Sequence, residues 1–333
     1  MTNAISIQLT GLDAQDPLAY LAGLGCLVAA SMHCRRAGLD EPKMCFDLAG
    51  VPRPALLGPF DDIEALLDVL VADLDAIAGR TEDSKRDSFL AFSYHDDKGQ
   101  PVQDLKPAPG DFSDAAQGWI NSASRDDRRT VDWAAAMLTD VAVDRSKGAA
   151  KPFALHFTAG QQRFLNVALE LLDGSSGKPP APGVGRDDLR SALIGPWPND
   201  RSLKVFSWSP TQDRPYALRA VDPATDPKLG TPGADWLALR GLELMSSSPR
   251  GSSIWTGGVE GKWKTGMFSY PIWPRPLDQD AVRALLRHPA VCAEGEARGS
   301  AGATLPRGVE VLTCRISRSD QGGYGSFSRP SRR

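Results

Sequence analysis

The pair His95-Asp96, followed by Asp97, is the first arrangement in this sequence whose residue types could do chemistry. A His-Asp pair resembles the metal-binding dipeptide of phosphohydrolases, in which further His and Asp ligands hold a metal that activates water. His33 and His156 are the nearby candidates to complete such a site. The pair stands in SYHDDKGQP, where polar residues before a Lys-Gly pair are equally typical of an exposed turn. A metal-dependent nuclease or phosphohydrolase therefore stays open beside a plain turn.

Segment 157–164, FTAGQQRF, has the residue types for an anion site. We expect a strand to enter a glycine-containing turn and then a helix, whose first backbone N–H groups attract anions. Thr158 and Gln161 have capping-box spacing. Arg163 falls in the first helical turn, where a cation is disfavoured unless a phosphate or an acidic partner docks there. Gln161 and Gln162 could donate hydrogen bonds to the same ligand. In the alternative reading, Gln161 only closes the capping box and Arg163 points into water.

The last quarter of the chain combines cations with aromatic rings. Residues 250–333 contain 13 Lys and Arg against 7 Asp and Glu, a net charge of +6, although the whole chain carries −3. Lys262 and Lys264 alternate with tryptophans, and Arg315, Arg318 and Tyr324 belong to a Gly- and Arg-rich end. Such residues neutralise phosphates and stack on bases. Alternatively, the tryptophans lie in a core with the lysines in water, and the end of the chain is a disordered segment without a role.

Complete catalytic motifs are absent from the sequence. It contains no phosphate-binding loop, no dinucleotide-binding glycine motif, no nucleophile elbow and no His-Glu-x-x-His. The acidic pairs at 61–62, 126–127 and 187–188 stand where helices begin, so capping explains them. The five cysteines form no Cys-x-x-Cys pair, which favours reduced thiols in a cytoplasm. We therefore expect a binding protein with no catalytic residue, no metal ligand and no cofactor.

The elements that must position these residues follow from periodicity and from capping residues. The two clearest helices are predicted here. The first begins at Asp16-Pro17 and ends at Gly38, and the second begins at Ile63 and ends at Gly79. Small residues at positions 22, 23 and 25 would let another element approach the first helix closely. Further helices are predicted over 111–124, 130–143, 233–245 and 279–287, and one after the Thr158 cap with a buried face from Phe164 to Leu172. Strands are predicted over 5–9, 44–48, 88–94, 153–157, 203–208, 253–257, 264–272 and 309–316.

This mixture without regular alternation predicts an α+β fold with mixed helices and short antiparallel sheets. The stretch DGSSGKPPAPGVGR is rich in Pro, Gly and Ser and predicts a linker or long loop between two subregions. The expected divisions are an N-terminal α/β region over 1–172, the linker over 173–186, a C-terminal α+β region over 187–316 and a basic tail over 317–333. No signal peptide and no apolar stretch of membrane-spanning length are expected.

Four short segments give the sequence a resemblance to a known family: GLDAQDPLAYLAGLG (11–25), FTAGQQRF (157–164), WSPTQDRPYAL (208–218) and GGYGSFS (322–328). In this order they resemble CRISPR-associated proteins of type I-G systems, formerly called I-U. The likeness is greatest to the large-subunit-like or accessory proteins of that effector complex. The resemblance implies a subunit of an RNA-guided complex whose partners are other effector subunits, guide RNA, target DNA and a separate helicase–nuclease. In such complexes protein reads a short flanking motif and pairing reads the sequence.

Three hypotheses follow. The first is a non-enzymatic subunit of a type I CRISPR surveillance complex in antiviral defence. In it Gln161, Gln162 and Arg163 bind an anion, while the basic residues of the last quarter contact the phosphate backbone. The second is the metal-dependent enzyme at His95-Asp96, and the third is a scaffold that binds only other subunits.

Overall fold

The computed structural model describes residues 5–82, 84–96, 98–124, 127–158, 162–177, 180–212, 229–251, 253–292, 304–318 and 324–333. Its elements form an α+β fold, as the sequence predicts. The helices are α1 (Pro17–Ala37), α2 (Ile63–Ala78), α3 (Pro109–Ser122), α4 (Arg129–Met137), α5 (Phe164–Asp173), α6 (Arg186–Ile194), α7 (Pro232–Gly241), α8 (Gln279–Leu286) and α9 (Pro289–Cys292). Short 3-10 turns are η1 (Pro210–Gln212) and η3 (Leu242–Leu244).

All strand pairs in the described chain are antiparallel. The strands are β1 (Ile5–Gln8), β2 (Lys43–Asp47), β3 (Arg53–Gly58), β4 (Tyr94–His95), β5 (Pro101–Val102), β6 (Val143–Asp144), β7 (Ala149–Ala150), β8 (Ser247–Arg250), β9 (Ser253–Thr256), β10 (Val259–Lys262), β11 (Thr265–Ile272), β12 (Glu310–Arg318), β13 (Gly325–Phe327) and β14 (Ser331–Arg332). A three-stranded sheet has the order β1-β3-β2, and a five-stranded sheet has the order β10-β11-β12-β13 with β14 paired to β12.

Local capping signals place the first two long helices. Asp16 caps α1 by accepting a hydrogen bond from the Leu18 N–H, and Gly38 ends it in a left-handed conformation with φ 66°. Asp62 caps α2 through the Ala65 N–H, and Gly79 ends that helix in the same way with φ 70°. The predicted bounds of both helices are confirmed. They could be predicted from the sequence because each boundary depends only on the residues next to it.

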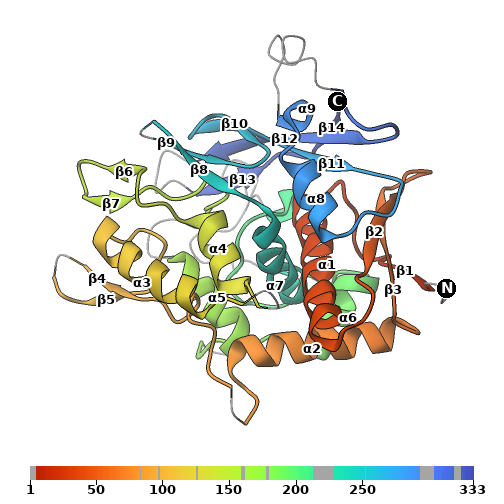
Figure 1. Cartoon of the computed structure of the whole chain (residues 1–333), viewed down its shortest axis with the longest axis horizontal. Coiled ribbons are helices and arrows are strands. Elements are labelled where there is room, and N and C mark those ends of the chain that lie inside the picture. Colours follow the sequence, from red (N-terminus) through yellow and green to blue (C-terminus); the bar gives the residue numbers. More distant parts are fainter. Residues whose placement is uncertain are drawn as a thin grey trace, which may run out of the picture.

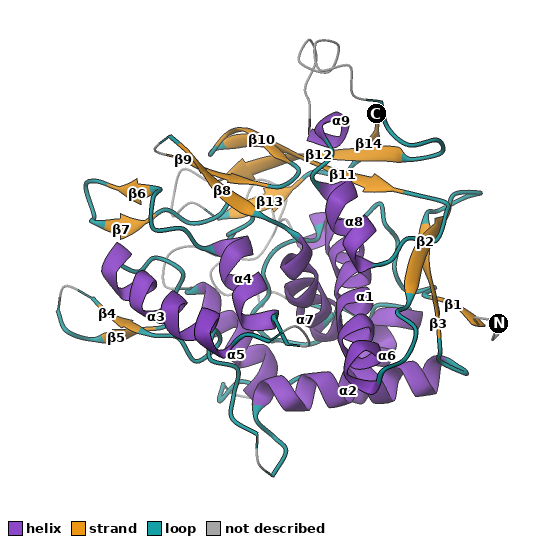
Figure 2. Ribbon diagram, viewed as in Figure 1, coloured by secondary structure: helices purple, strands orange, loops and turns teal. Residues whose placement is uncertain are grey.

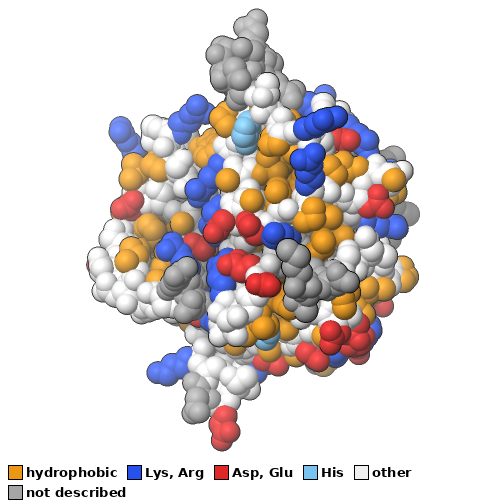
Figure 3. All heavy atoms as spheres, turned by 45° about the vertical axis from the view of Figure 1, so that its right-hand side comes forward, with side chains coloured by type: hydrophobic (Ala, Val, Ile, Leu, Met, Phe, Trp, Pro, Cys, Tyr) orange, Lys and Arg blue, Asp and Glu red, His pale blue; other side chains and the backbone are white. Residues whose placement is uncertain are grey.

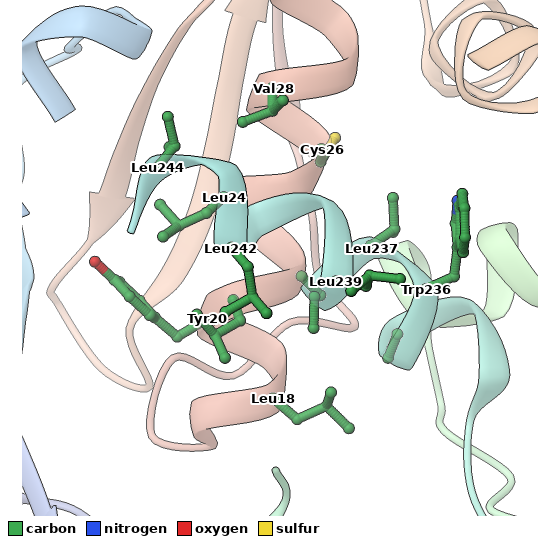
Figure 4. Packing of buried hydrophobic residues seen from close by; sticks show 14 of the residues in the cluster. Leu18, Tyr20, Leu24, Cys26, Val28, Trp236, Leu237, Leu239, Leu242 and Leu244 are labelled. Carbon is green, nitrogen blue, oxygen red and sulfur yellow. The ribbon is translucent and has the colours of Figure 1, made fainter. Parts of the chain in front are cut away.

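The core is built on α1 and α7, which cross in the middle of the molecule (Figures 1 and 4). Every residue of α7 is buried, and so is most of α1. Gly25 makes the close approach possible, because a Cβ added there would overlap the Leu237 carbonyl and lie 2.9 Å from the Gly241 nitrogen. The expectation that small residues admit a neighbour is confirmed at this position.

The sheets and remaining helices surround this pair. In Figures 1 and 2 the five-stranded sheet lies along the top, α2 crosses the bottom, the three-stranded sheet lies on the right and α3, α4 and α5 lie on the left. Buried residues from both sides of the predicted 173–186 linker belong to one hydrophobic cluster, which runs from Ile7 to Phe327. Within that stretch, Ser175 pairs with Ala181 in an isolated bridge. The regions before and after it thus share a core in the described residues.

Three predicted strands are wrong. Residues 88–91 form a turn, and the segments 153–157 and 203–208 are irregular although nearly fully buried. Side chains from distant elements replace the missing strand partners, as buried backbone groups require. The Trp208 indole donates to the Leu155 carbonyl, and the Asp235 carboxylate accepts from the Phe206 N–H. Segments 153–157 and 203–208 are apolar because they are buried, although they do not pair in a sheet.

The expectation of a disordered end is wrong for the described residues after 323. β13 and β14 both pair with β12, and Phe327 packs inside against Phe157 and Phe268. The end of the chain joins the sheet through the backbone pairing of β13 and β14 with β12 and through the buried ring of Phe327.

Helix α1 also corrects the expectation that no stretch has membrane-spanning length. Its 21 residues are long and apolar enough to cross a bilayer, but 94% of that window is buried inside the protein. It is the central helix of a globular core.

Candidate nucleic-acid interface

The four segments that carry the family resemblance meet in space, although up to 317 residues of sequence separate their ends. Contacts between side chains connect them one to the next. These are Asp16 with Ser209, Trp208 with Phe164, and Phe157 with Phe327. Residues 159–161, 213–218 and 322–323 of these segments lie outside the described residues. The described parts form one continuous region between the start of α1 and the edge strand β13.

The five-stranded sheet turns one face toward this core and the other outward. Strand register places Lys262, Thr265, Ser317 and Ser326 in one outward row, and Glu260, Met267 and Arg315 in the next. The alternate residues, such as Phe268 and Ile316, are buried.

At the far end of the outer face, α9 covers the sheet, where Val291 packs on Val311. The end with Lys262 and Arg315 is exposed. In Figure 3, several lysine and arginine side chains lie along the upper part of the molecule, whereas acidic side chains lie in the middle of this face, next to basic ones, and at the lower right. Two of the predicted phosphate contacts, Lys262 and Arg315, therefore share one exposed basic surface. Lys264 follows in the exposed turn after β10.

Arg318 was expected to contact phosphate, but in the structure its side chain is buried. It is 8% exposed, and its guanidinium donates to the carbonyls of Trp263 (3.0 Å), His156 (2.8 Å) and Ala154 (2.6 Å). Burial lowers the pKa of Arg318 to about 10. Its donors hold the irregular segment 154–157 against the end of the sheet, which is a structural role. We therefore leave Arg318 out of the surface that meets phosphate.

Arg163 lines a hollow of about 340 Å³ on the other side of that segment, with Ser93, Pro101, Gln103 and Asn166. The predicted capping box is not formed, because α5 begins at Phe164, whose N–H donates to the Asp104 carboxylate (3.0 Å). Gln162 is half-buried beside Arg163, and Gln161 lies outside the described residues. The hollow is polar and holds the cation that the sequence placed at this helix start.

Asp104 also holds His156, and Thr158 contacts the same imidazole ring. The Asp104 carboxylate lies 3.3 Å from His156 Nε2, and Thr158 Oγ1 lies 3.4 Å from Nδ1. Burial lowers the pKa of His156, so the ring is neutral at neutral pH. Burial raises the pKa of Asp104, but the His156 hydrogen bond and the Lys106 charge outweigh it and leave that pKa below its ordinary value. This buried cluster fixes the segment before Arg163.

The His95-Asp96 pair forms part of a hairpin turn after β4. The Asp96 carboxylate accepts hydrogen bonds from the N–H groups of Lys98 and Gln100, both at 2.9 Å. Asp97 lies outside the described residues. Neither His33 nor His156 joins a group of three or more His, Cys, Asp or Glu side chains, and the described chain contains no such group. The geometry of Asp96 is that of a turn-forming residue.

A second hollow, also of about 340 Å³, lies at the start of α1, and Asp13, Asp16, Arg53 and Trp197 contribute to its lining. Burial raises the pKa of Asp16 to about 6, although a hydrogen bond from Ser209 opposes the shift. This carboxyl joins two of the four family segments and titrates close to neutral pH.

The contribution of Asp16 to the free energy of unfolding should therefore fall as pH rises from about 4 to about 6. In this window the folded protein keeps a proton on Asp16 that the unfolded chain, with a pKa of 3.8, has lost. Asp16→Asn keeps an N-cap acceptor without titrating. We expect the stability difference between wild type and variant to change by about 1 to 2 kcal/mol across the window, since the hollow admits solvent. Urea unfolding at several pH values measures it, and parallel pH profiles would contradict the assignment.

Trp263 is the exposed residue that sequence reasoning assigned to the wrong environment. The core reading holds for Trp273, which is 1% exposed, but Trp263 is 46% exposed in the two-residue turn between β10 and β11. Its position between two lysines could have indicated that it is exposed. The alternation of buried and exposed side chains along a strand does not extend into a turn, so it could not place Trp263 in the core.

Comparisons of the chain with protein-family models, with curated protein sequences and with solved structures find no match.

Proposed function

We propose that this chain is a non-enzymatic subunit of a type I CRISPR RNA-guided surveillance complex, and that it contacts nucleic acid through the outward face of its five-stranded sheet. The observation that carries the proposal is the exposed end of that face. Lys262 and Arg315 stand there among the hydroxyl side chains of Thr265, Ser317 and Ser326. Cations with hydroxyl donors are the residues that bind phosphate and sugar.

The family resemblance supports the remainder of the proposal. Its four segments contact one another in the fold, as segments that build one interaction region would. In the proposed complex the partners are other effector subunits, the guide RNA and target DNA, with a helicase–nuclease recruited afterwards. The complex acts in the cytoplasm, and the acidic remainder of the chain faces protein subunits.

Neutralising the basic surface should weaken binding in a salt-dependent way. The variant Lys262→Gln/Lys264→Gln/Arg315→Gln is expected to bind single-stranded and duplex oligonucleotides roughly 10- to 100-fold more weakly at low salt, with a shallower dependence of affinity on salt. Fluorescence anisotropy across a salt series measures both quantities. Fewer phosphate contacts release fewer counterions, which is why the slope must change together with the affinity.

A matched control removes three cations far from this face: Lys43→Gln/Arg53→Gln/Lys85→Gln, all exposed in the wild type. It changes the net charge equally, so equal losses in both triple variants would show that only overall charge matters. Wild-type protein without affinity for either oligonucleotide would exclude the nucleic-acid role and favour a scaffold that binds only other subunits.

The CRISPR assignment has its own test. Tagged protein purified from its own host should bring down other subunits with small RNAs of uniform repeat–spacer form, identified by sequencing. Protein that is recovered alone and free of RNA would contradict membership of the complex, whatever its affinity for oligonucleotides in isolation.

A further inference from the structure

Trp263 is an exposed indole ring at the end of the proposed nucleic-acid surface. It occupies the turn between β10 and β11, with exposed Lys262 before it and exposed Lys264 after it. Tyr324, 39% exposed, precedes the register partner of Arg318 at the same end of the sheet. An indole that is 46% exposed is a large apolar surface to leave in water.

The ring is held from beneath by a cation. The guanidinium carbon of Arg318 lies 3.7 Å from the Trp263 ring centroid and 4.9 Å from that of Phe157, so Arg318 contacts both aromatic rings. Its Nε also donates to the Trp263 backbone carbonyl. Hydrogen bonds to the carbonyls of His156 and Ala154 anchor the guanidinium to the core. Trp263 therefore cannot turn freely, and one face of its ring is already covered.

Trp263 is 46% exposed and has the positive charge of Arg318 against one face of its ring. Among the described residues no carboxylate forms an ion pair with Arg318, so its charge is not neutralised within that part of the protein. A planar, electron-rich group continues such a stack most favourably, and negative charge beside it would meet Lys262 and Lys264.

We propose that Trp263 is a stacking platform for an unpaired base of single-stranded nucleic acid, with the base on the ring face that Arg318 does not cover. Lys262 and Lys264, which flank Trp263 in the chain, then contact the phosphates beside that base. A paired base in a duplex shows only its edges to a protein, so the geometry selects single strands. The inference rests on the proposed function, since it names the ligand form that the basic surface receives.

The test compares wild type with Trp263→Ala and Trp263→Phe, using labelled oligothymidine and oligouridine and the same oligomers with abasic sugars. Trp263→Ala should weaken binding of the base-containing oligomers about 5- to 100-fold and leave the salt dependence unchanged. Binding of the abasic oligomers should be equal in wild type and Trp263→Ala. Trp263→Phe should retain most of the affinity, because a ring still covers Arg318.

The outcomes separate this inference from the proposed function. If wild-type binding depends on salt and on Lys262 and Arg315 but Trp263→Ala has no effect, the stacking platform is wrong and the basic surface stands. Equal losses for base-containing and abasic oligomers would also overturn it. Ile120→Ala, at an exposed position on α3, serves as the distant control, and circular dichroism checks that each variant is folded. No wild-type affinity for any of these oligomers would refute both proposals.

Discussion

Gly25→Ala should destabilise the protein by about 3 kcal/mol or more, although it adds a single methyl group. The new Cβ would overlap the backbone carbonyl of Leu237 and lie 2.9 Å from the nitrogen of Gly241. Both neighbours are backbone atoms of buried segments, so no side chain can rotate away to make room. The two helices would have to separate, which exposes apolar surface along the most buried contact of the fold.

Gly23→Ala is the matched control, because the same change is made in the same helix only two residues earlier. Its Cβ would lie 3.4 Å from the nearest atom, the Pro54 side chain, which is an ordinary contact. Alanine favours a helix over glycine by up to about 1 kcal/mol, so this variant should be as stable as the wild type or slightly more so. Urea midpoints for the three proteins measure the difference. A Gly25→Ala midpoint equal to that of the wild type would mean that α1 and α7 do not approach as described.

The close crossing of α1 and α7 also illustrates what local sequence signals determine. The N-caps at Asp16 and Asp62 and the terminal glycines at 38 and 79 act on neighbouring backbone groups, so the sequence predicts both helices within one residue. The same sequence indicates that α1 admits a close neighbour, but not that the neighbour is α7, more than 200 residues later. Pairing over such a distance depends on the whole core.

The irregular buried segments could not be predicted for the same reason. Residues 153–157 are apolar and short, which is typical of a strand, and only the fold reveals that Arg318 and Trp208 serve their carbonyl groups. Predicting a strand there assumes that buried backbone pairs with backbone. In this protein long side chains from other elements take that place.

The candidate site was partly predictable from strand alternation. Lys262 and Arg315 were expected on a phosphate-binding surface and do share the outward face of one sheet. Arg318 continues the same strand with the opposite parity to Arg315, and so its side chain is directed inward. In the amino-acid composition the two arginines contribute equally to the basic charge. The strand register shows that Arg315 is exposed and Arg318 is buried. The role of Trp263 depends on Arg318 beneath it, a contact that no spacing in the sequence reveals.

A second large effect is expected in the interior, at a buried ion pair between α2 and α7. Arg240 is fully buried, and its guanidinium donates to both Asp73 oxygens at 2.8 and 3.2 Å. Glu243, also buried, forms an ion pair with the same arginine. Burial lowers the pKa of Arg240, which shows how far the group is removed from water. The pair joins α2, in the first half of the chain, to α7.

Arg240→Met should lower the free energy of unfolding by about 3 to 5 kcal/mol, because it leaves two buried carboxylates without their cation. The double variant Arg240→Met/Asp73→Leu should recover part of that loss, since one of the stranded charges is replaced by an apolar group of similar volume.

The matched surface pair is Arg86 with Asp173, which is also bidentate, at 3.0 and 2.7 Å through both Nη atoms, but whose side chains are 33% and 48% exposed. Arg86→Met should cost no more than about 1 kcal/mol, because solvent screens both charges and hydrates the carboxylate that remains. Urea unfolding of all four proteins under one condition gives the comparison. The decisive quantity is the ratio of the two single-variant losses, since both arginines hold an aspartate in a bidentate pair and the two sites differ strongly in burial. Similar losses at both sites would mean that Arg240 reaches water and that its ion pair with Asp73 is not enclosed.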